Sequence, residues 1–435
     1  MVSRLISIMI GSLSAFIFFI PVSASAYPAY LTYTYNHHIF SINALRHPEW
    51  RIKKKAWFFH GLPAVPPARF LAYGKDETYP AGWTYQEQTA WSKEAIAETV
   101  ATEISAKLDR PAGDVVISRN ESGSVVFGGY GLTGLQVDKN LAVELTKTAL
   151  ESGVSSIVLP VSVTQPKITV SDESLRQAGI REVVTVGESV FAKSPVNRRH
   201  NIEVGVNRFN GHLIPKGTVF SFNEALGPVN QKTGYKKELV IQGDTTLPDY
   251  GGGLCQVSST AYRGPWEYGL PIVQRKNHSY AVSYYSPQGT DATIFPPNVD
   301  LKFKNDTPGG LLIQSFTDST DRAYFIYYGT KDNRQSEVFG PYISGRIAAP
   351  PEEKIIYTTE IPPGEKRKAG ERHDGMKAVW YRRVRMEGTG AILERVFSAY
   401  QARPLIYQIG RTSSDMASPT LGDLSSTPSW LPSKP

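Results

Sequence analysis

The chain has 435 residues, enough for two or three domains at about 150 residues each. Its 47 basic and 40 acidic residues give a net charge of +7. This charge could suit binding to an anionic wall polymer, but an ordinary solvated basic surface is the simpler interpretation. One cysteine excludes an internal disulfide, and the absence of a basic, aromatic recognition module argues against nucleic acid as a partner. Abundant Tyr, Gly and Pro favour strands and turns over long helices.

The first 26 residues have the pattern of a secretory signal peptide. Arg4 is the only charge among them, an apolar run extends over residues 5–20, and Ala24-Ser25-Ala26 supplies the small-residue cleavage site. The run is shorter than the roughly 20 apolar residues of a membrane span, which favours cleavage before Tyr27 over an anchor. We therefore expect export to the periplasm, cell wall or exterior, with no stable membrane insertion after cleavage.

The mature chain begins with an aromatic, irregular segment at residues 27–84. Within it, residues 31–35 alternate like a strand, and the basic run at residues 51–55 is interpreted as a solvated face. Residues 85–170 are predicted to form a small mixed α/β module. It contains a helix that buries Ile96, Val100, Ile104 and Leu108, because these apolar residues recur every four positions.

The rest of this module is predicted to be a hairpin, a helix and a strand. The hairpin joins residues 114–118 to residues 124–127 across Asn-Glu-Ser-Gly, and Asp138 is a candidate cap for a helix that buries Leu141, Leu145 and Ala149. Residues 155–163 form the closing strand. Nothing in this pattern is typical of catalysis, and small modules of this kind more often bind or position a ligand than react with it.

The C-terminal third is predicted to be rich in strands. Residues 335–410 contain strand patterns at residues 354–359, 378–386 and 392–400, with a turn at residues 362–364. Residues 411–435 have little to bury and are expected to be disordered. Residues 180–310 contain the densest motifs and are predicted to form a mixed central domain. The predicted fold class is therefore multidomain α+β, with a mixed α/β N-terminal module, this mixed central domain and a β-rich C-terminal module.

The sharpest chemical signal is the sequence Gly-Gly-Gly-Leu-Cys-Gln at residues 251–256. Glycines allow positive φ and close approach of backbone to a ligand, and the segment from Cys255 to residue 263 has helical character, with Gly264-Pro265 expected to end or kink it. A thiol at the first turn of a helix has a lowered pKa. The backbone N–H groups of Gly252, Gly253 and Gln256 are candidates to hold an oxyanion, so the pattern predicts a cysteine nucleophile for acyl transfer. An inert core thiol is the alternative.

A thiol nucleophile usually needs a base, and His278 is the best placed of the eight histidines. It lies 23 residues beyond Cys255, enough for a helix, a turn and a returning strand. Asp291 is the first candidate to orient this base, with Asp300 the second. Arg275 is a candidate to bind a substrate carboxylate.

No metal or cofactor is predicted. No two histidines have ligand spacing near the cysteine, and the adjacent His37 and His38 could not share one helix face.

Residues 180–306 resemble a VanW domain. The region before it, about 85–170, is similar to the peptidoglycan-binding module that often precedes VanW, and the region after it, about 335–410, looks like the G-five wall module. The matching VanW stretches lie at residues 197–202, 215–223, 234–235, 251–256, 275–279, 289–292 and 300–305. One departure follows the cysteine, where Ala-Tyr-Arg-Gly-Pro-Trp at residues 261–266 replaces the family's Leu-Tyr-Asn-Ala-Ala-like run.

The resemblance implies a role in peptidoglycan cross-linking. Some VanW proteins are held to be L,D-transpeptidases; the family cysteine matches Cys255 and the family histidine matches His278. Peptidoglycan stem peptides and glycan would be the partners, and no cofactor would be needed. Two other readings stay open: a non-catalytic wall-binding or scaffold protein in which Cys255 is a packing residue, and a thiol-dependent wall hydrolase.

Overall fold

The computed structural model describes residues 27–72, 78–242, 245–388 and 390–412. The predicted signal peptide at residues 1–26 and nearly all of the predicted disordered tail lie outside the described residues. Within the described part of the chain, no helix has the length and apolarity needed to cross a membrane.

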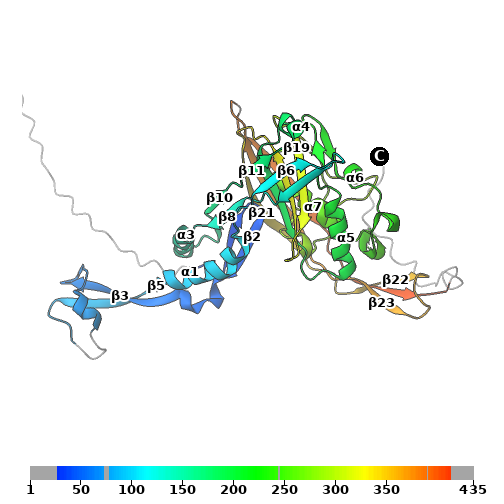
Figure 1. Cartoon of the computed structure of the whole chain (residues 1–435). Helices are drawn as coiled ribbons and strands as arrows, with labels where there is room; N and C mark the ends of the chain where they lie inside the picture. The colour runs from blue at the N-terminus through cyan, green and yellow to red at the C-terminus, as the bar shows by residue number, and fades with distance from the viewer. Residues whose placement is uncertain (1–26, 73–77, 243–244, 389, 413–435) are drawn as a thin grey trace, which may run out of the picture. The chain divides into compact units, whose positions relative to one another are not determined.

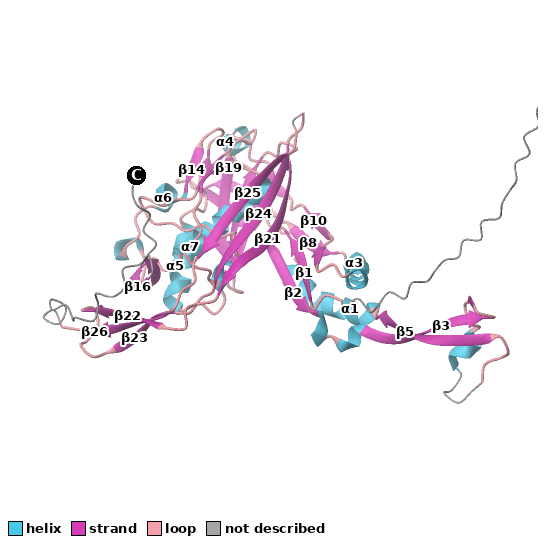
Figure 2. Cartoon of the chain, turned by 180° about the vertical axis from the view of Figure 1, so that it is seen from behind, coloured by secondary structure: helices cyan, strands magenta, loops and turns pink. Residues whose placement is uncertain are grey.

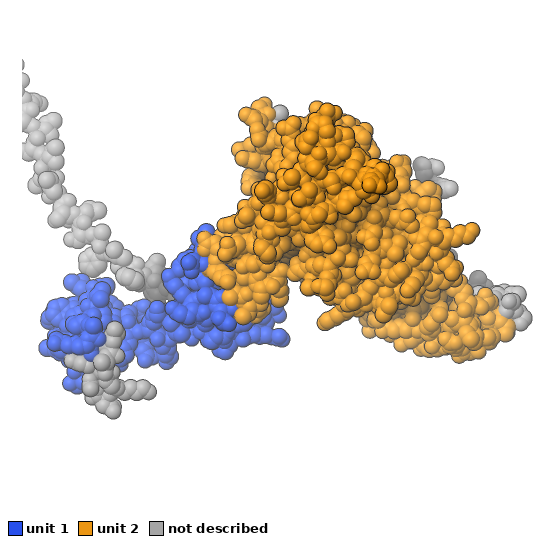
Figure 3. Space-filling view, viewed as in Figure 1, with its two compact units in different colours: residues 1–33, 41–98, 140–157 blue, residues 34–40, 99–139, 158–435 orange. Residues whose placement is uncertain are grey.

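The fold class is α+β, as predicted, with strands distributed over several separate sheets. The chain divides into two compact units (Figure 3). Among the described residues, unit 1 contains those within 27–33, 41–98 and 140–157, and unit 2 contains those within 34–40, 99–139 and 158–412. The candidate site described below belongs entirely to unit 2.

Unit 1 is dominated by an antiparallel ribbon of two nine-residue strands, β3 and β5 (Figure 1). Trp57 on β3 is buried against the aromatic rings of Trp83 and Tyr85 on β5. The basic run at residues 51–55 lies mostly exposed, as expected. The elements in or entering this unit are β1 (Tyr30–Tyr35), β2 (His38–Asn43), η1 (Ala44–Arg46), η2 (Pro48–Trp50), β3 (Arg51–Phe59), β4 (Leu62–Pro63), η3 (Ala68–Ala72), β5 (Trp83–Trp91), α1 (Lys93–Thr99), α3 (Lys139–Ser152) and β9 (Ser156–Val158).

Several predictions for residues 85–170 are confirmed. The four-residue stripe from Ile96 to Leu108 is buried, although its middle turn is a π-helix, and the hairpin forms as β6 and β7. The corresponding elements are η4 (Val100–Ser105), α2 (Ala106–Leu108), β6 (Val115–Arg119), β7 (Val125–Gly129), β8 (Gly134–Val137), β10 (Val161–Thr164) and β11 (Ile168–Val170).

Two predictions in this region are wrong in detail. Helix α3 forms, but Leu141 is 47% exposed, because the buried stripe starts one residue later, at Ala142. The single closing strand is instead two strands, β9 and β10, separated at Pro160, which has no N–H for a continuous ladder.

The core of unit 2 is a four-stranded antiparallel sheet in the order β12-β20-β19-β13, packed against helices α5 and α7 (Figure 1). Apolar side chains of α7, such as Val257 and Ala261, share one cluster with Val206 of α5 and Phe325 of β20. The elements are α4 (Glu173–Gln177), β12 (Glu182–Val190), α5 (Val196–Asn207), β13 (Leu213–Ile214), β14 (Val219–Ser221), α6 (Phe222–Leu226), η5 (Gln231–Thr233), β15 (Lys237–Gln242), β16 (Thr245–Tyr250), α7 (Leu254–Tyr268), β17 (Ile272–Gln274), η6 (Ser283–Tyr285), β18 (Lys302–Lys304), β19 (Leu311–Thr317) and β20 (Arg322–Gly329).

Helix α7 does not end at Gly264-Pro265, which was one of the two predicted effects of this pair: it continues through Pro265 to Tyr268, with Gly269 as its C-cap at φ +97°. Proline lacks the N–H that would bond the carbonyl of Ala261. The hydroxyl of Tyr327 on β20 donates to that carbonyl at 2.7 Å. The sheet therefore replaces the missing helical hydrogen bond and keeps the helix continuous.

The C-terminal segment is β-rich, as predicted. Figure 2 shows β21, β24 and β25 side by side, and the antiparallel register pairs Trp380 with Val396. A second sheet has the order β22-β26-β23. The strands are β21 (Gln335–Ile347), β22 (Glu353–Thr358), β23 (Lys366–Gly370), β24 (Gly375–Arg385), β25 (Ile392–Tyr400) and β26 (Leu405–Gly410).

Candidate active site

Cys255 is the second residue of α7, so the thiol lies at the first turn of a 15-residue helix, where the sequence placed it. Gly251 and Gly253 have φ of +84° and +114°. A Cβ on Gly252 would lie 2.8 Å from the carbonyl oxygen of Leu239, and one on Gly253 would lie 3.1 Å from Cγ of Arg198. The glycines thus allow the turn before Cys255 to fit between β15 and α5.

The backbone at this turn offers free donors. Among the described residues, no acceptor is found for the N–H groups of Gly252, Gly253 and Cys255. The N–H of Gln256 differs, because it donates to the carbonyl of Gly253 at 2.9 Å. Gly252 and Gly253 thus remain candidates for an oxyanion site, whereas the Gln256 N–H is already used.

The side chain of Gln256 is fully buried and has a structural role. Its Oε1 accepts from Arg198 at 2.7 Å, and its Nε2 donates to the carbonyl of Val190 at 2.8 Å. These bonds link α7 to α5 and β12.

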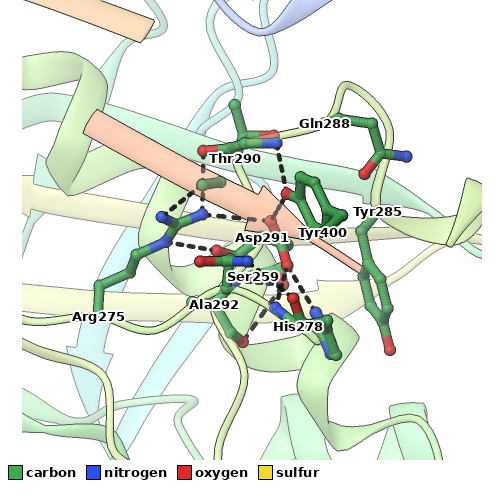
Figure 4. Close-up of polar contacts among 12 residues, drawn as sticks. Ser259, Arg275, His278, Tyr285, Gln288, Thr290, Asp291, Ala292 and Tyr400 are labelled. Carbon is green, nitrogen blue, oxygen red and sulfur yellow. Dashed lines mark hydrogen bonds and ion pairs between the residues drawn. The ribbon is translucent and has the colours of Figure 1, made fainter. Parts of the chain in front are cut away.

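His278 and Asp291 form a buried pair (Figure 4). Nδ1 of His278 lies 2.6 Å from Oδ2 of Asp291, and the backbone N–H of His278 donates to the same oxygen at 2.8 Å. The two residues are 3% and 1% exposed. Because the carboxylate engages Nδ1, it fixes the ring and leaves Nε2, which is buried and makes no hydrogen bond. Asp300, the other candidate, instead bonds Ser221 and the N–H of Asn223.

The thiol and the imidazole influence each other's ionisation. Burial acts to raise the pKa of Cys255, but His278, the backbone of Ile294 and the hydroxyl of Thr293 outweigh it, so the thiol pKa is lowered. Burial acts to lower the pKa of His278, but Asp291 and Cys255 raise it to about 9. Sγ itself lies 3.5 Å from Oγ1 of Thr293. This electrostatic pattern favours a thiolate beside an imidazolium.

Arg275 does not have the geometry predicted for a substrate ligand. Its guanidinium is 7% exposed and donates to four acceptors of the protein: the carbonyl of Asp291 at 2.6 Å, Oδ1 of Asp291 at 3.2 Å, the carbonyl of Gly289 at 3.0 Å and Oγ of Ser398 at 2.9 Å. Every nitrogen of the group is occupied. Arg275 therefore holds the Asp291 segment in place (Figure 4).

Two tyrosines complete the surroundings of His278, and the sequence analysis named neither. Tyr400, at the end of β25, donates to Oδ1 of Asp291 and accepts from the N–H of Gly289 at 2.7 Å. The ring of Tyr285 stacks on that of His278, with centroids 4.1 Å apart and planes inclined by 12°. The strand ending at Tyr400 was predictable, but no local pattern connects it with Asp291.

Two serines that follow Cys255 on α7 link this helix to the loop that carries Asp291. Oγ of Ser259 accepts from the N–H of Ala292 at 2.9 Å and donates to the carbonyl of Cys255 at 2.7 Å, and Ser258 donates to the carbonyl of Ala292. The helix carrying the thiol is thereby fixed to the loop carrying the carboxylate. The Ser-Ser pair three residues beyond the cysteine was the available sequence signal.

Comparison with known proteins identifies this region. Residues 197–327 match the family model of VanW-like proteins. The chain is 31% identical over 198 residues to the uncharacterized protein YoaR of Bacillus subtilis, an alignment covering 45% of this chain and 63% of the relative. It is 32% identical over 116 residues to the vancomycin B-type resistance protein VanW of Enterococcus faecalis, covering 26% and 42%. Residues 197–327 are therefore the VanW-like region of this chain.

The VanW match contains Cys255, His278, Asp291 and Arg275, but it ends before Tyr400 and Ser398. Part of the hydrogen-bond network around His278 and Asp291 therefore comes from β25, a strand outside the matched region. The chain spans less than two thirds of the length of either relative. No solved structure matches the chain.

Proposed function

We propose that this chain, through its VanW-like region, is a cysteine acyltransferase of the L,D-transpeptidase type, which forms 3→3 cross-links in peptidoglycan. The observation that carries the proposal is the buried Asp291–His278 pair, whose imidazole lowers the pKa of a thiol at the first turn of a helix. An oriented base next to an activated thiol is the arrangement that covalent acyl transfer requires.

In the first half-reaction, the Cys255 thiolate attacks the carbonyl carbon of the third residue of a tetrapeptide stem. The N–H groups of Gly252, Gly253 and Cys255, for which no acceptor is found among the described residues, are the candidates to stabilise the oxyanion. When the tetrahedral intermediate collapses, the C–N bond to the terminal D-alanine breaks. The imidazolium of His278 gives its proton to the departing amine, and a thioester remains on Cys255.

In the second half-reaction, the side-chain amine of a neighbouring stem attacks the thioester. Neutral His278 accepts the proton of that amine, a new amide bond forms and the Cys255 thiolate leaves. Water in place of the amine would give a carboxypeptidase. Both steps use only protein groups, so the proposed chemistry needs no cofactor.

The proposed setting is the cell envelope, with the mature chain in the periplasm or wall and peptidoglycan stems and glycan as partners. The signal-peptide pattern of residues 1–26 supports export. The printed name of the Enterococcus relative, a vancomycin resistance protein, supports a connection with the wall.

The test is a muropeptide assay with the purified mature protein. Disaccharide-tetrapeptides are incubated with the wild type and with Cys255→Ala, His278→Ala and the control His212→Gln. The control changes a histidine that lies edge-to-face against Phe220, outside the candidate site. We expect dimers that lack one D-alanine from the wild type and from the control only. Mass spectrometry identifies the products.

Two outcomes would contradict the proposal. Equal product from the wild type and Cys255→Ala would exclude the thiol as nucleophile. If the wild type and all variants form no product but still bind purified sacculi, the interpretation as a non-catalytic wall-binding protein would be favoured.

A further inference from the structure

A histidine pair lies at the hairpin that joins β1 to β2, outside the VanW match. Asn36 has φ +51°, and the turn that it forms brings the rings of His37 and His38 to 4.2 Å between centroids, inclined by 32°. The prediction that adjacent histidines cannot share a face applies to a helix, whereas these residues lie at a tight turn. Both rings therefore reach the same neighbour.

That neighbour is Glu188 on β12, which is 4% exposed. One ring nitrogen of each histidine and a carboxylate oxygen of Glu188 all lie within 4.8 Å of one another. Oε1 of Glu188 lies 2.7 Å from Nε2 of His38, so the two residues form a buried pair. A nitrogen and an oxygen this close together fit two ligand atoms directed at one shared ion.

Glu267 on α7 holds His37 from the other side. Its Oε1 lies 2.5 Å from Nδ1 of His37 and accepts the backbone N–H of His37 at 3.0 Å. A carboxylate on one ring nitrogen fixes the tautomer and leaves the other nitrogen as a lone-pair donor, which is the usual outer partner of a metal-bound histidine.

The cluster of His37, His38 and Glu188 borders a cavity. A cavity of about 210 Å³ is lined by Tyr35, His37, His38, Arg110, Glu188 and Glu267, among others. Arg110 engages Oε2 of Glu188 and leaves Oε1 turned towards the histidines. Two imidazoles and one carboxylate leave further coordination positions for water or a small ligand.

We propose that His37, His38 and Glu188 bind one divalent transition-metal ion, for which Zn²⁺ is the probe, with Glu267 as the outer partner of His37. Glu267 lies 12 residues beyond Cys255 on the same helix, about 18 Å along its axis at 1.5 Å per residue. The metal site is thus separate from the cysteine site, and the proposal does not depend on the proposed function.

The test uses the purified mature chain after treatment with a chelator. Zn²⁺ binding is measured by titration calorimetry, and retained metal by elemental analysis. We expect one ion per chain, binding weaker by at least about 100-fold in His38→Gln and Glu188→Gln, and weaker by about 10- to 100-fold in Glu267→Gln. The matched control is His47→Gln, which removes a histidine paired with exposed Glu49 and should bind as the wild type does.

A second measurement needs no variant. Co²⁺ added to the wild-type apoprotein should give the intense visible absorption of a low-symmetry protein site, which Zn²⁺ should abolish by displacement. A spectrum equal to that of aqueous Co²⁺, or Zn²⁺ binding that is the same in the wild type and in folded His38→Gln, would overturn the proposal. Thermal unfolding curves establish that each variant is folded.

Discussion

The hydroxyl of Tyr400 donates a hydrogen bond to Oδ1 of Asp291, across 109 positions of the chain. The other oxygen of the same carboxylate accepts from His278. The tyrosine ends β25, beyond the region that matches VanW. The C-terminal sheet is therefore part of the environment that orients the candidate base, rather than only an appended module.

Replacing Tyr400 should weaken this support. In Tyr400→Phe, the N–H of Gly289 loses its acceptor and Asp291 loses a donor, so we expect a loss of about 1–3 kcal/mol in the free energy of unfolding. Muropeptide transfer should slow with little change in KM, since the bond orients the base. Denaturant unfolding and steady-state assays measure both effects. The control is Tyr342→Phe, an exposed tyrosine on β21; equal behaviour of the two variants would contradict the role.

The reactivity of Cys255 should depend on pH in a defined direction. Because its pKa is lowered, alkylation by iodoacetamide should reach half its maximal rate below about pH 8.5, the value of a free thiol. His278→Ala removes the imidazolium, so the midpoint should move upwards and the rate at pH 7 should fall about tenfold for each pKa unit. A midpoint that is unchanged in His278→Ala would contradict the pairing.

Turnover should decline on the alkaline side for a separate reason. The protonated form of His278 is the proposed acid for the D-alanine amine, and its pKa is raised to about 9. Below that pH the acid is present; above it, the proton is lost and kcat/KM should fall. Asp291 stays ionised throughout, because its pKa is held below the usual range: burial opposes this, but His278 and Arg275 outweigh burial. A rate that keeps rising above pH 9 would contradict the assignment.

Arg275 should behave as a structural residue. Since its guanidinium serves four protein acceptors, Arg275→Lys should lower the free energy of unfolding by about 3 kcal/mol while leaving binding to purified sacculi unchanged. Unfolding and pull-down measurements separate the two effects. A variant of normal stability with weakened substrate binding would restore the substrate-ligand interpretation.

Substitution by alanine should be more harmful at a glycine just before Cys255 than at a glycine in an open turn. Gly253→Ala introduces a Cβ at 3.0 Å from Cγ1 of Ile202 at φ +114°, whereas Gly217→Ala at φ +79° meets no atom within 4 Å. We expect backbone strain to lower the free energy of unfolding by about 1 kcal/mol in both variants, and the steric contact to lower it further in Gly253→Ala. Alkylation of Cys255 should slow only in Gly253→Ala. Equal effects of the two changes would mean that packing at Gly253 is unimportant.

The hydrogen bond from Tyr327 to α7 should matter because of Pro265. Tyr327→Phe leaves the carbonyl of Ala261 without its donor, with an expected loss of about 1–3 kcal/mol. In the Pro265→Ala background, the new N–H can bond that carbonyl, so the same change should have a smaller effect. A double-mutant cycle on unfolding free energies measures the coupling. Coupling energy near zero would show that the two features are independent.

Local patterns in the sequence predicted much of the secondary structure. The four-residue repeat from Ile96 to Leu108, the hairpin at β6 and β7, and the strand from Ile392 to Tyr400 depend on side-chain periods of 3.6 and 2, which can be read along the chain. The error at Leu141 arose because that period does not tell which neighbouring stripe meets the core.

The sequence by itself placed Cys255 at a helix start and named His278 and Asp291, since the glycine run and the residue types carry that chemistry locally. Only the tertiary structure decided that Arg275 holds Asp291, that the amide of Gln256 is already bonded and that Tyr400 completes the site. It also brought Glu188 to the histidine pair. The physical reason is that a buried polar group must find a partner, and which distant residue supplies it depends on how the sheets and helices pack.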